Sequence, residues 1–269
     1  MKQLSIIGLA SMLWLSGTVA HADFRSDLLL AADPNFSDNY VRSHFLRLAK
    51  KPFNPGDKRS KALIIGDGHA QDFLNSVIEN GLLPHYQIRT RHIPARCQPY
   101  LGPENPRSFI QPRDTAFCAG SDSLEQARTQ VSQAKLVVLA ADWKPWSARR
   151  LGTTIRNLKL QPGQKLVVLG RKYFGRINIH AYLRMPESRL HGLRNAVAPE
   201  QLAVNTILRN QVPAHSFVNQ QQLICRPATS CPLFTDKLRL LSFDGTHLTQ
   251  AGARYIGPLL FRSPVLGSL

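Results

Sequence analysis

Acidic residues are scarce in this chain. Its 269 residues include 34 lysines and arginines but only 17 aspartates and glutamates, so the formal net charge is +17. A strongly cationic surface favours anionic partners such as acidic polysaccharide, lipopolysaccharide phosphate or nucleic acid. The basic residues are scattered, however, and no aromatic-interleaved binding motif accompanies them. We therefore expect a generally cationic protein rather than one with a nucleic-acid groove.

Long apolar runs are missing beyond the first residues, so no later stretch reaches the roughly 20 apolar residues needed to span a bilayer. Met1–Ala22 has the pattern of a secretory signal, with Lys2, an apolar core and a small-x-small cleavage site at residues 20–22. We expect cleavage near Ala22, a periplasmic or secreted location, and no transmembrane segment in the mature chain. An uncleaved membrane anchor is the alternative, but its apolar core is short for a span.

Only four cysteines occur, and none of them forms a CxxC pair. An even number of cysteines in an exported chain favours disulfides. Cys225 and Cys231 would close a small loop, and Cys97 with Cys118 would then tether a long irregular segment rich in proline and glycine. A zinc site is the alternative, and the missing CxxC spacing argues against it. We expect two disulfides, no metal and no cofactor.

Short apolar runs alternate with helical patterns along most of the chain. The sequence predicts strands over 62–65, 86–93, 136–140, 165–169 and 217–218. It predicts helices over 36–48, 69–79, 121–133, 146–158, 200–210 and 250–260. This alternation indicates an α/β fold with a doubly wound, mainly parallel sheet. We expect one domain over 58–269, preceded by a lead-in over 23–57.

A sharp turn follows the first predicted strand. Gly66, Asp67 and Gly68 break the apolar run, and a helix begins near His69. Free N–H groups at a helix start attract negative charge, and ligands of open α/β sheets lie at the carboxyl ends of strands. Asp67, Gly68 and His69 are therefore expected at a site for substrate or an oxyanion. The alternative is that Asp67 is only a helix cap.

A second candidate feature lies near the C-terminus, where Asp244 precedes His247 by three residues. A carboxylate at this spacing can bind one ring nitrogen and leave the other nitrogen free to act as a base. The spacing alone is common by chance. A divalent-metal site built from Asp67, His69, Asp244 and His247 is an alternative use of the same residues.

The two features together resemble the SGNH (GDSL-like) hydrolases. The run from Gly66 to Ala70, GDGHA, is similar to the Gly-Asp-Ser-His-Ala block of SGNH domains linked to bacterial surface-polysaccharide acyltransferases. The segment 225–253, with its Cys-bounded loop and the run FDGTHLTQAGA, is similar to the C-terminal block of those domains. The resemblance covers about Lys61 to Tyr255 and implies a three-layer α/β/α, flavodoxin-like fold.

The resemblance also implies a site and a reaction. It implies acyl-ester chemistry on acidic or acylated surface polysaccharide, with a membrane acyltransferase as a partner. His247 would be the general base, Asp244 its orienting acid, and the N–H of Gly68 a donor of the oxyanion hole. Trp143 stands where the acyltransferase-linked group carries an aromatic residue, so we expect it near the substrate. The alternative for Trp143 and Trp146 is a core or rim position.

The chain departs from the family at the nucleophile, because Gly68 stands in the serine position. Ser76 lies two turns down the predicted helix, and Ser242 and Thr246 lie on the segment of the base, so none is a ready substitute. Removing one member of a catalytic triad leaves only residual acceleration. We expect weak or absent esterase activity, with water activated by His247 as one route. The alternative is a non-catalytic periplasmic binding protein for an anionic glycan.

The residues after the third and fourth predicted strands allow more than one role. The oxyanion-hole asparagine of the family is not evident, and Asp142 is a poor replacement because an anion opposes the developing oxyanion. Arg171, Lys172 and Arg176 follow the fourth predicted strand. They either meet an anionic substrate or belong to a solvated loop.

Overall fold

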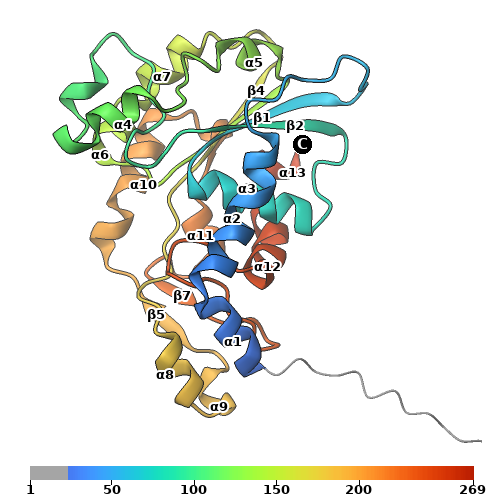
Figure 1. Cartoon of the computed structure of the whole chain (residues 1–269), viewed down its shortest axis with the longest axis vertical. Coiled ribbons are helices and arrows are strands. Elements are labelled where there is room, and N and C mark those ends of the chain that lie inside the picture. The colour runs from blue at the N-terminus through green and yellow to red at the C-terminus, as the bar shows by residue number, and fades with distance from the viewer. Residues whose placement is uncertain (1–23) are drawn as a thin grey trace, which may run out of the picture.

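A five-stranded parallel sheet organises the computed structural model, which describes residues 24–269, so the predicted leader 1–22 lies outside the described residues (Figure 1). The strand order is β2-β1-β3-β4-β6, and all four pairings are parallel. The strands are β1 (Ser60–Gly66), β2 (Tyr86–His92), β3 (Leu136–Ala140), β4 (Lys165–Leu169) and β6 (Phe217–Val218). This is the flavodoxin-like order, and it confirms the predicted α/β fold.

The described residues also form helices, most of which cover the two faces of the sheet. They are α1 (Phe24–Ala32), α2 (Pro34–Leu48), α3 (Gly68–Glu79), α4 (Thr115–Ala119), α5 (Arg128–Gln133), α6 (Pro145–Arg149), α7 (Leu151–Leu158), α8 (Ile179–Arg184), α9 (Glu187–Leu190), α10 (Pro199–Gln211), α11 (Gln220–Ile224), α12 (Gln250–Leu260) and α13 (Pro264–Gly267). Short 3-10 turns are η1 (Pro106–Ser108), η2 (Pro112–Asp114) and η3 (Ala214–Ser216). A separate antiparallel pair joins β5 (Arg194–Ala196) to β7 (Ser230–Pro232).

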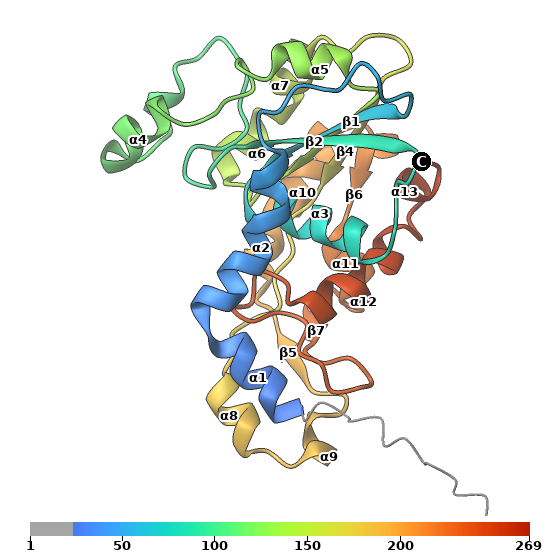
Figure 2. The same ribbon diagram turned by 45° about the vertical axis from the view of Figure 1, so that its right-hand side comes forward.

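The sheet is buried on both faces, because helices cover each side. Helices α3 and α12 lie on one side of the sheet, and α5 and α7 lie on the other (Figure 2). Ala62 and Ile64 of β1 pack with residues of α3 and α12, whereas Leu63 and Ile65 pack with residues of α5 and α7. Successive strand side chains point to opposite faces, so a strand covered on both sides must be apolar throughout. All four of these side chains have 0% exposure. The continuous apolar run in the sequence follows from this packing.

Two predicted helices differ from the structure. Residues 121–133 are helical only from Arg128, because Asp122 accepts the N–H of Ser123 and pairs with the buried Arg91. A side chain bonded to a neighbouring backbone group competes with helix formation. The helix predicted over 146–158 is divided at Arg150, whose guanidinium is bound by Glu104. In both places a side-chain partner distant in sequence overrides the local pattern.

Both predicted disulfides are confirmed. Cys97–Cys118 tethers the irregular segment between β2 and α5, and Cys225–Cys231 closes the small loop that carries part of β7. The first bridge explains how a long segment without a strand stays attached to the domain. The second holds the chain just before the segment that bears Asp244 and His247.

The segment predicted as a lead-in forms α1 and α2. Helix α2 packs against α3 and β2. The side-chain amide of Asn75, on α3, donates to the carbonyls of Tyr40 and Val41, and the hydroxyl of Thr90, on β2, donates to the carbonyl of Phe45. Helix α1 was not predicted. It packs near α8, where Phe24 and Leu28 join a third apolar cluster with Tyr182 and other residues.

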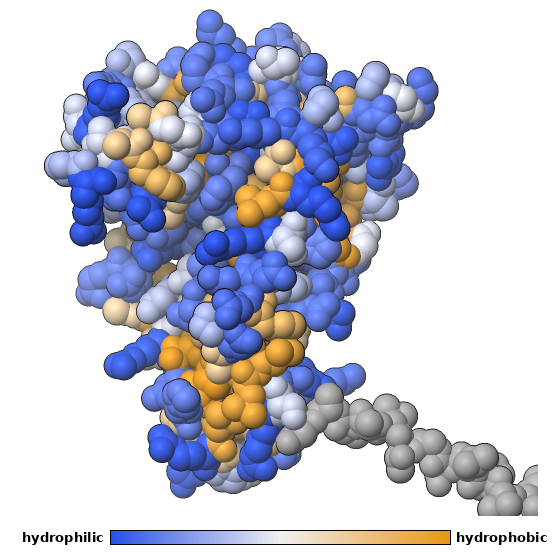
Figure 3. All heavy atoms as spheres, in the orientation of Figure 1, coloured by the Kyte–Doolittle hydropathy of each residue, from blue (hydrophilic) through white to orange (hydrophobic). Residues whose placement is uncertain are grey.

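The visible surface is mostly hydrophilic, and apolar atoms gather over the lower part near α1 (Figure 3). Leu29 and Leu30 of that helix are 59% and 45% exposed. Within residues 24–269, no helix is both long enough and apolar enough to cross a membrane.

Candidate active site

The turn after β1 lies at the point where the sheet order reverses, between β1 and β3. Gly66 has φ +146°, and a β-carbon there would lie 1.7 Å from the carbonyl oxygen of Ala140, so only glycine allows the two strand ends to approach this closely. Ligand sites of flavodoxin-like sheets occur at this switch point. The strand order thus places the predicted turn at a position suited to a site.

Asp67 holds this switch point together. Its Oδ1 accepts the N–H of His69 at 2.9 Å, which caps α3, and its Oδ2 accepts the N–H of Asp142 at 2.8 Å. Burial raises the pKa of Asp67 to about 6, although the two N–H donors favour the ionised form. Both carboxylate oxygens are therefore engaged by backbone groups, and Asp67 joins the end of β1 to the end of β3.

His247 lies directly against Gly68. A β-carbon placed on Gly68 would be 2.1 Å from Nε2 and 2.6 Å from Cδ2 of the imidazole. Ordinary contacts between such atoms begin near 3.4 Å. The imidazole thus fills the volume in which a side chain at residue 68 would begin. The structure brings together the two sequence blocks, one from the first βα turn and one from the segment before α12.

Asp244 orients the His247 ring. Its Oδ2 lies 2.6 Å from Nδ1 of His247, and its Oδ1 accepts the N–H groups of Thr246 and His247, both at 2.7 Å. A carboxylate at Nδ1 places the proton there when the ring is neutral and leaves the Nε2 lone pair free. The side chain of His247 is 32% exposed, so the ring is partly open to solvent.

Opposing effects set the ionisation of this pair. Burial alone would lower the pKa of His247, but the hydrogen bond to Asp244 and the negative charges of Asp72 and Asp244 raise it above its ordinary value. Burial alone would raise the pKa of Asp244, but the hydrogen bond from His247 and its charge lower the pKa below the ordinary value. The pair therefore favours an ionised carboxylate beside an imidazole that holds its added proton more tightly than usual.

Asp72 and Lys172 form a buried ion pair beneath the His247 loop. The Nζ of Lys172 lies 2.6 Å from Oδ2 of Asp72, and the two side chains are 2% and 1% exposed. Lys172 also donates to the carbonyl of Thr246 at 2.7 Å, and Asp72 accepts the N–H of Leu248 at 3.0 Å. The pair thus binds the backbone on each side of His247.

Sequence reasoning missed this pair. It left Lys172 open as a substrate contact or a solvated residue, and it gave Asp72 no role. One signal was present: Asp72 lies four residues after Gly68 and therefore on the same side of α3. A carboxylate there, in a helix whose interior residues are buried, requires a cation as its partner. The sequence offers many cations and does not specify Lys172.

The neighbouring strand ends carry a charged rim. Asp142, after β3, is held by Arg171 Nε at 2.8 Å and by Lys144 Nζ at 2.7 Å. Arg171 follows β4, so the two strand ends are joined by charge. Arg176 is exposed, and its carbonyl accepts the side-chain amide of Asn195. Asp142 is thus neutralised by two cations at the edge of the site.

The structure does not place Trp143 beside a ligand surface. Its ring is 0% exposed, and its indole N–H donates to the carbonyl of Leu169 at 2.9 Å. The expectation of a substrate contact needs correction for this reason, since the ring is used to pack the ends of β3 and β4. Trp146 is partly buried and stacks on Phe109, with ring centroids 5.3 Å apart. It belongs to an aromatic cluster on the irregular segment.

His69 is buried in the same region without a hydrogen bond to either ring nitrogen, and it is 2% exposed. Burial, followed by the charges of Lys172 and His247, holds the pKa of His69 well below its ordinary value, so the ring is neutral. Across residues 24–269 no group of three or more His, Cys, Asp or Glu side chains is arranged to hold a metal. The oxygens of Asp67 and Asp244 are bound instead by backbone N–H groups and by the ring of His247.

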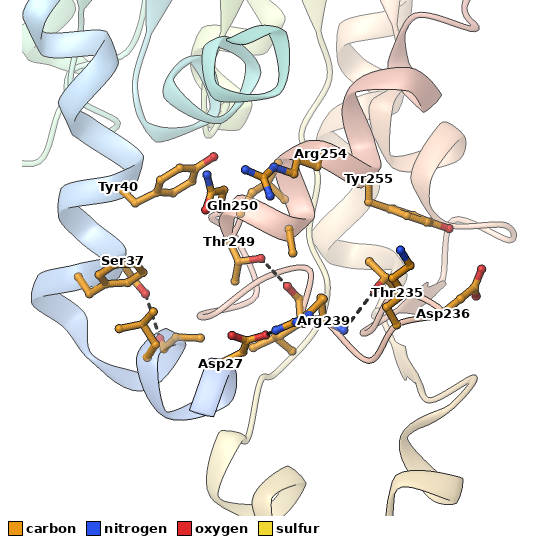
Figure 4. A pocket seen from close by; sticks show the side chains of 17 residues that line it. Asp27, Ser37, Tyr40, Thr235, Asp236, Arg239, Thr249, Gln250, Arg254 and Tyr255 are labelled. Carbon is orange, nitrogen blue, oxygen red and sulfur yellow. Dashed lines mark hydrogen bonds and ion pairs between the residues drawn. The ribbon is translucent and has the colours of Figure 1, made fainter. Parts of the chain in front are cut away.

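A separate cavity of about 760 Å³ lies between α1, α2, the 235–240 loop and α12 (Figure 4). Its lining includes Leu248 and Thr249, the two residues after His247, but neither His247 nor Gly68. Charges of both signs line it, among them the paired Asp27 and Arg239. The cavity therefore shares a segment with the His247 loop without opening on the imidazole.

Comparisons with known proteins bear on the fold and the family. The chain is similar in structure to the periplasmic domain of a lipopolysaccharide acetyltransferase from Salmonella ser. Paratyphi A, with 14% sequence identity and a TM-score of 0.52. The alignment covers 87% of this chain and 97% of that chain, and at this identity it shows the fold alone. No curated protein matches the sequence. The family model described as SGNH domain (fused to AT3 domains) matches residues 36–262. Because that match spans most of the chain, the protein belongs to this SGNH domain family, as the two sequence blocks indicated.

Proposed function

We propose that this protein cleaves acyl esters of a cell-envelope polysaccharide slowly, through His247 and Asp244 and without a serine acyl-enzyme. The observation that carries the proposal is the position of Nε2 of His247 against Gly68, with Asp244 bound to Nδ1. A neutral imidazole with a free Nε2 can cleave an ester as a general base or as a nucleophile. Either route needs His247, and neither route needs a hydroxyl at residue 68.

The helix start supplies the remaining group. The N–H of Gly68 begins the twelve-residue helix α3 and has no hydrogen-bond acceptor among the described residues. A free N–H at a helix start stabilises developing negative charge, as in an oxyanion hole. A single donor of this kind, without a side-chain amide beside it, supports low turnover. Loss of the family serine supports low turnover as well.

The proposed substrate class follows from the net charge, the family and the structural neighbour. The net charge of +17 favours an anionic polymer. The family is described as fused to AT3 domains, and the structural neighbour is a domain of a lipopolysaccharide acetyltransferase. We therefore propose an acidic or acylated surface polysaccharide as the substrate and a membrane acyltransferase as a partner. The two disulfides and the predicted leader support a periplasmic or secreted location.

Release of acetate from an O-acetylated acidic polysaccharide, together with hydrolysis of p-nitrophenyl acetate, tests the proposal. We expect turnover by the parent protein to exceed that of His247→Ala by about tenfold or more, because the variant lacks the general base or nucleophile. His85→Ala is the matched control, since His85 is an exposed histidine outside the site. Equal rates for the parent and His247→Ala would overturn the proposal.

A non-catalytic binding role is the second candidate, and the missing hydroxyl at Gly68 favours it. It predicts that the parent and His247→Ala bind an acidic polysaccharide with equal affinity while neither releases acetate. Isothermal titration calorimetry on the samples used for the hydrolysis assay distinguishes the two candidates.

A further inference from the structure

We propose that Nε2 of His247 is itself the nucleophile and carries the acyl group as an N-acylimidazolium, with the proton kept on Nδ1. This inference rests on the proposed function, because it assigns the bond-forming step of that ester cleavage. It differs from general-base catalysis, in which water is the nucleophile and His247 takes only a proton from it. The two mechanisms use the same residue and are separated by whether the protein becomes acylated.

Position is the first argument. With 2.1 Å between Nε2 and a β-carbon placed on Gly68, the nitrogen lies inside the volume of the absent hydroxymethyl group. An ester carbonyl at the start of α3 reaches Nε2 when the ring tilts away from Gly68, because no further atom fits between them in this arrangement. The glycine is required for this arrangement, because any larger side chain would displace the ring.

The electronic state of the ring is the second argument. Asp244 binds Nδ1 at 2.6 Å, so in the neutral ring the proton lies on Nδ1 and the lone pair on Nε2. Nε2 makes no hydrogen bond with any residue of the described chain. The same carboxylate can stabilise the positive charge that the ring acquires when Nε2 forms a bond. Asp244 thus supports attack as well as orienting the imidazole.

Rigidity is the third argument. Lys172 binds the carbonyl of Thr246, Asp72 binds the N–H of Leu248, and both side chains are buried. Phe243 also stacks on the imidazole, with ring planes 19° apart. A nucleophile held in this way loses little conformational freedom when it reacts. The backbone contacts hold His247 toward Gly68 rather than toward open solvent.

The step balances without a co-reactant beyond water. The Nε2 lone pair attacks the carbonyl carbon, and the N–C bond forms while the N–H of Gly68 faces the oxyanion. The C–O ester bond then breaks, and the sugar alkoxide leaves and takes a proton from water, which becomes hydroxide. Hydroxide attacks the N-acylimidazolium, the C–N bond breaks, and carboxylic acid and neutral His247 result.

The test follows the acyl group. The full mature chain is mixed with phenyl acetate or p-nitrophenyl acetate in the presence of hydroxylamine, and acetohydroxamate and acetate are both measured. If both esters form the same acyl-protein, the ratio of acetohydroxamate to acetate should be the same for both. The leaving group has departed before the acyl-protein reacts with hydroxylamine or water. Intact-protein mass spectrometry within seconds of mixing should show one added acetyl group, which peptide mapping places on His247.

Two glycine variants sharpen the result. Gly68→Ala puts a methyl group where Nε2 lies, so we expect the adduct to fall at least about tenfold although His247 is present. Gly120→Ala is the matched control, since a β-carbon there meets nothing closer than 3.8 Å, and it should keep the parental adduct. Thermal unfolding of each variant confirms that it is folded.

The outcomes separate the two proposals. His247-dependent hydrolysis with no adduct, and with a product ratio that changes with the leaving group, overturns the nucleophile and leaves the esterase intact. No His247-dependent hydrolysis overturns both. An adduct on His247 that Gly68→Ala leaves unchanged overturns the assignment of position.

Discussion

Asp72 and Lys172 are a hundred residues apart in the chain, yet their side chains meet at 2.6 Å and bind the backbone on both sides of His247. The geometry of the candidate active site therefore depends on a contact between α3 and the segment after β4. Because both charges are almost fully buried, removing only one of them leaves the other buried and unpaired, which destabilises the fold.

Lys172→Met should destabilise the protein by about 3–5 kcal/mol, because it leaves the Asp72 carboxylate buried and unpaired. The double variant Asp72→Leu with Lys172→Met should cost less than the sum of the two single variants, because neither charge remains. Urea denaturation measures each free energy of unfolding. Asp38→Asn in the exposed Asp38–Arg42 pair is the control and should cost less than about 1 kcal/mol. Additive losses in the double variant would contradict this account of the pair.

Gly68→Ser should not simply restore a family triad. Its β-carbon would lie 2.1 Å from Nε2, so the ring must withdraw and strain its bond to Asp244. We expect a loss of about 1–3 kcal/mol in unfolding free energy, as for other overpacked sites. Thermal unfolding measures the loss, and an NMR spectrum of the Nδ1 proton reports the bond to Asp244. A variant as stable as the parent, with that proton unshifted, would show that space for the serine already exists.

The pH dependence follows from the raised pKa of His247. The unprotonated ring is the reactive form, so hydrolysis should rise with pH through a midpoint above the ordinary histidine value of about 6.5. For stability the sign is opposite: the protonated ring stabilises the fold fully below pH 6.5, and this contribution is lost as pH rises through the folded-state pKa. A pH–rate profile with a parallel NMR titration of the His247 ring tests both.

Asp244→Asn is the control for this profile. It removes the charge and changes the hydrogen bond that raise the pKa of His247, so the midpoint should move down. A parental midpoint below 6.5, or an upward shift in the variant, would be inconsistent with the arrangement described.

His69→Leu should be nearly neutral for stability or should increase it. Both ring nitrogens of His69 are buried and unpaired among the described residues, so an apolar side chain of similar size removes an unsatisfied polar group. We expect the unfolding free energy to change by less than about 1 kcal/mol. Chemical denaturation measures it, and Asp67→Ala should cost more, since it removes a helix cap and the link to Asp142. A loss of several kcal/mol in His69→Leu would indicate a polar partner for its ring.

Much of the fold could be predicted because its signals are local. The apolar runs of β1, β3 and β4 are continuous because both faces of these strands are covered. The turn at Gly66 and the cap at Asp67 lie within a few residues of each other, and so do Asp244 and His247. The cysteine pairing followed from loop length and is confirmed.

The remaining features depend on contacts between distant segments. Nothing near Lys172 in the sequence indicates that Asp72 is its partner, or that the indole of Trp143 turns toward the carbonyl of Leu169. The depth at which the His247 ring enters the space beside Gly68 is likewise set by packing. Sequence therefore indicated that the Gly68 turn and the His247 segment meet, but neither the Asp72–Lys172 pair nor the distances within the site, which only the folded chain defines.

The most direct measurement of the central claim is acetate release from an O-acetylated acidic polysaccharide by the parent protein and by His247→Ala, above the pKa of His247. The account predicts release by the parent that is at least about tenfold faster than by the variant, since the imidazole beside Gly68 performs the chemistry. Equal release by the two proteins would contradict it.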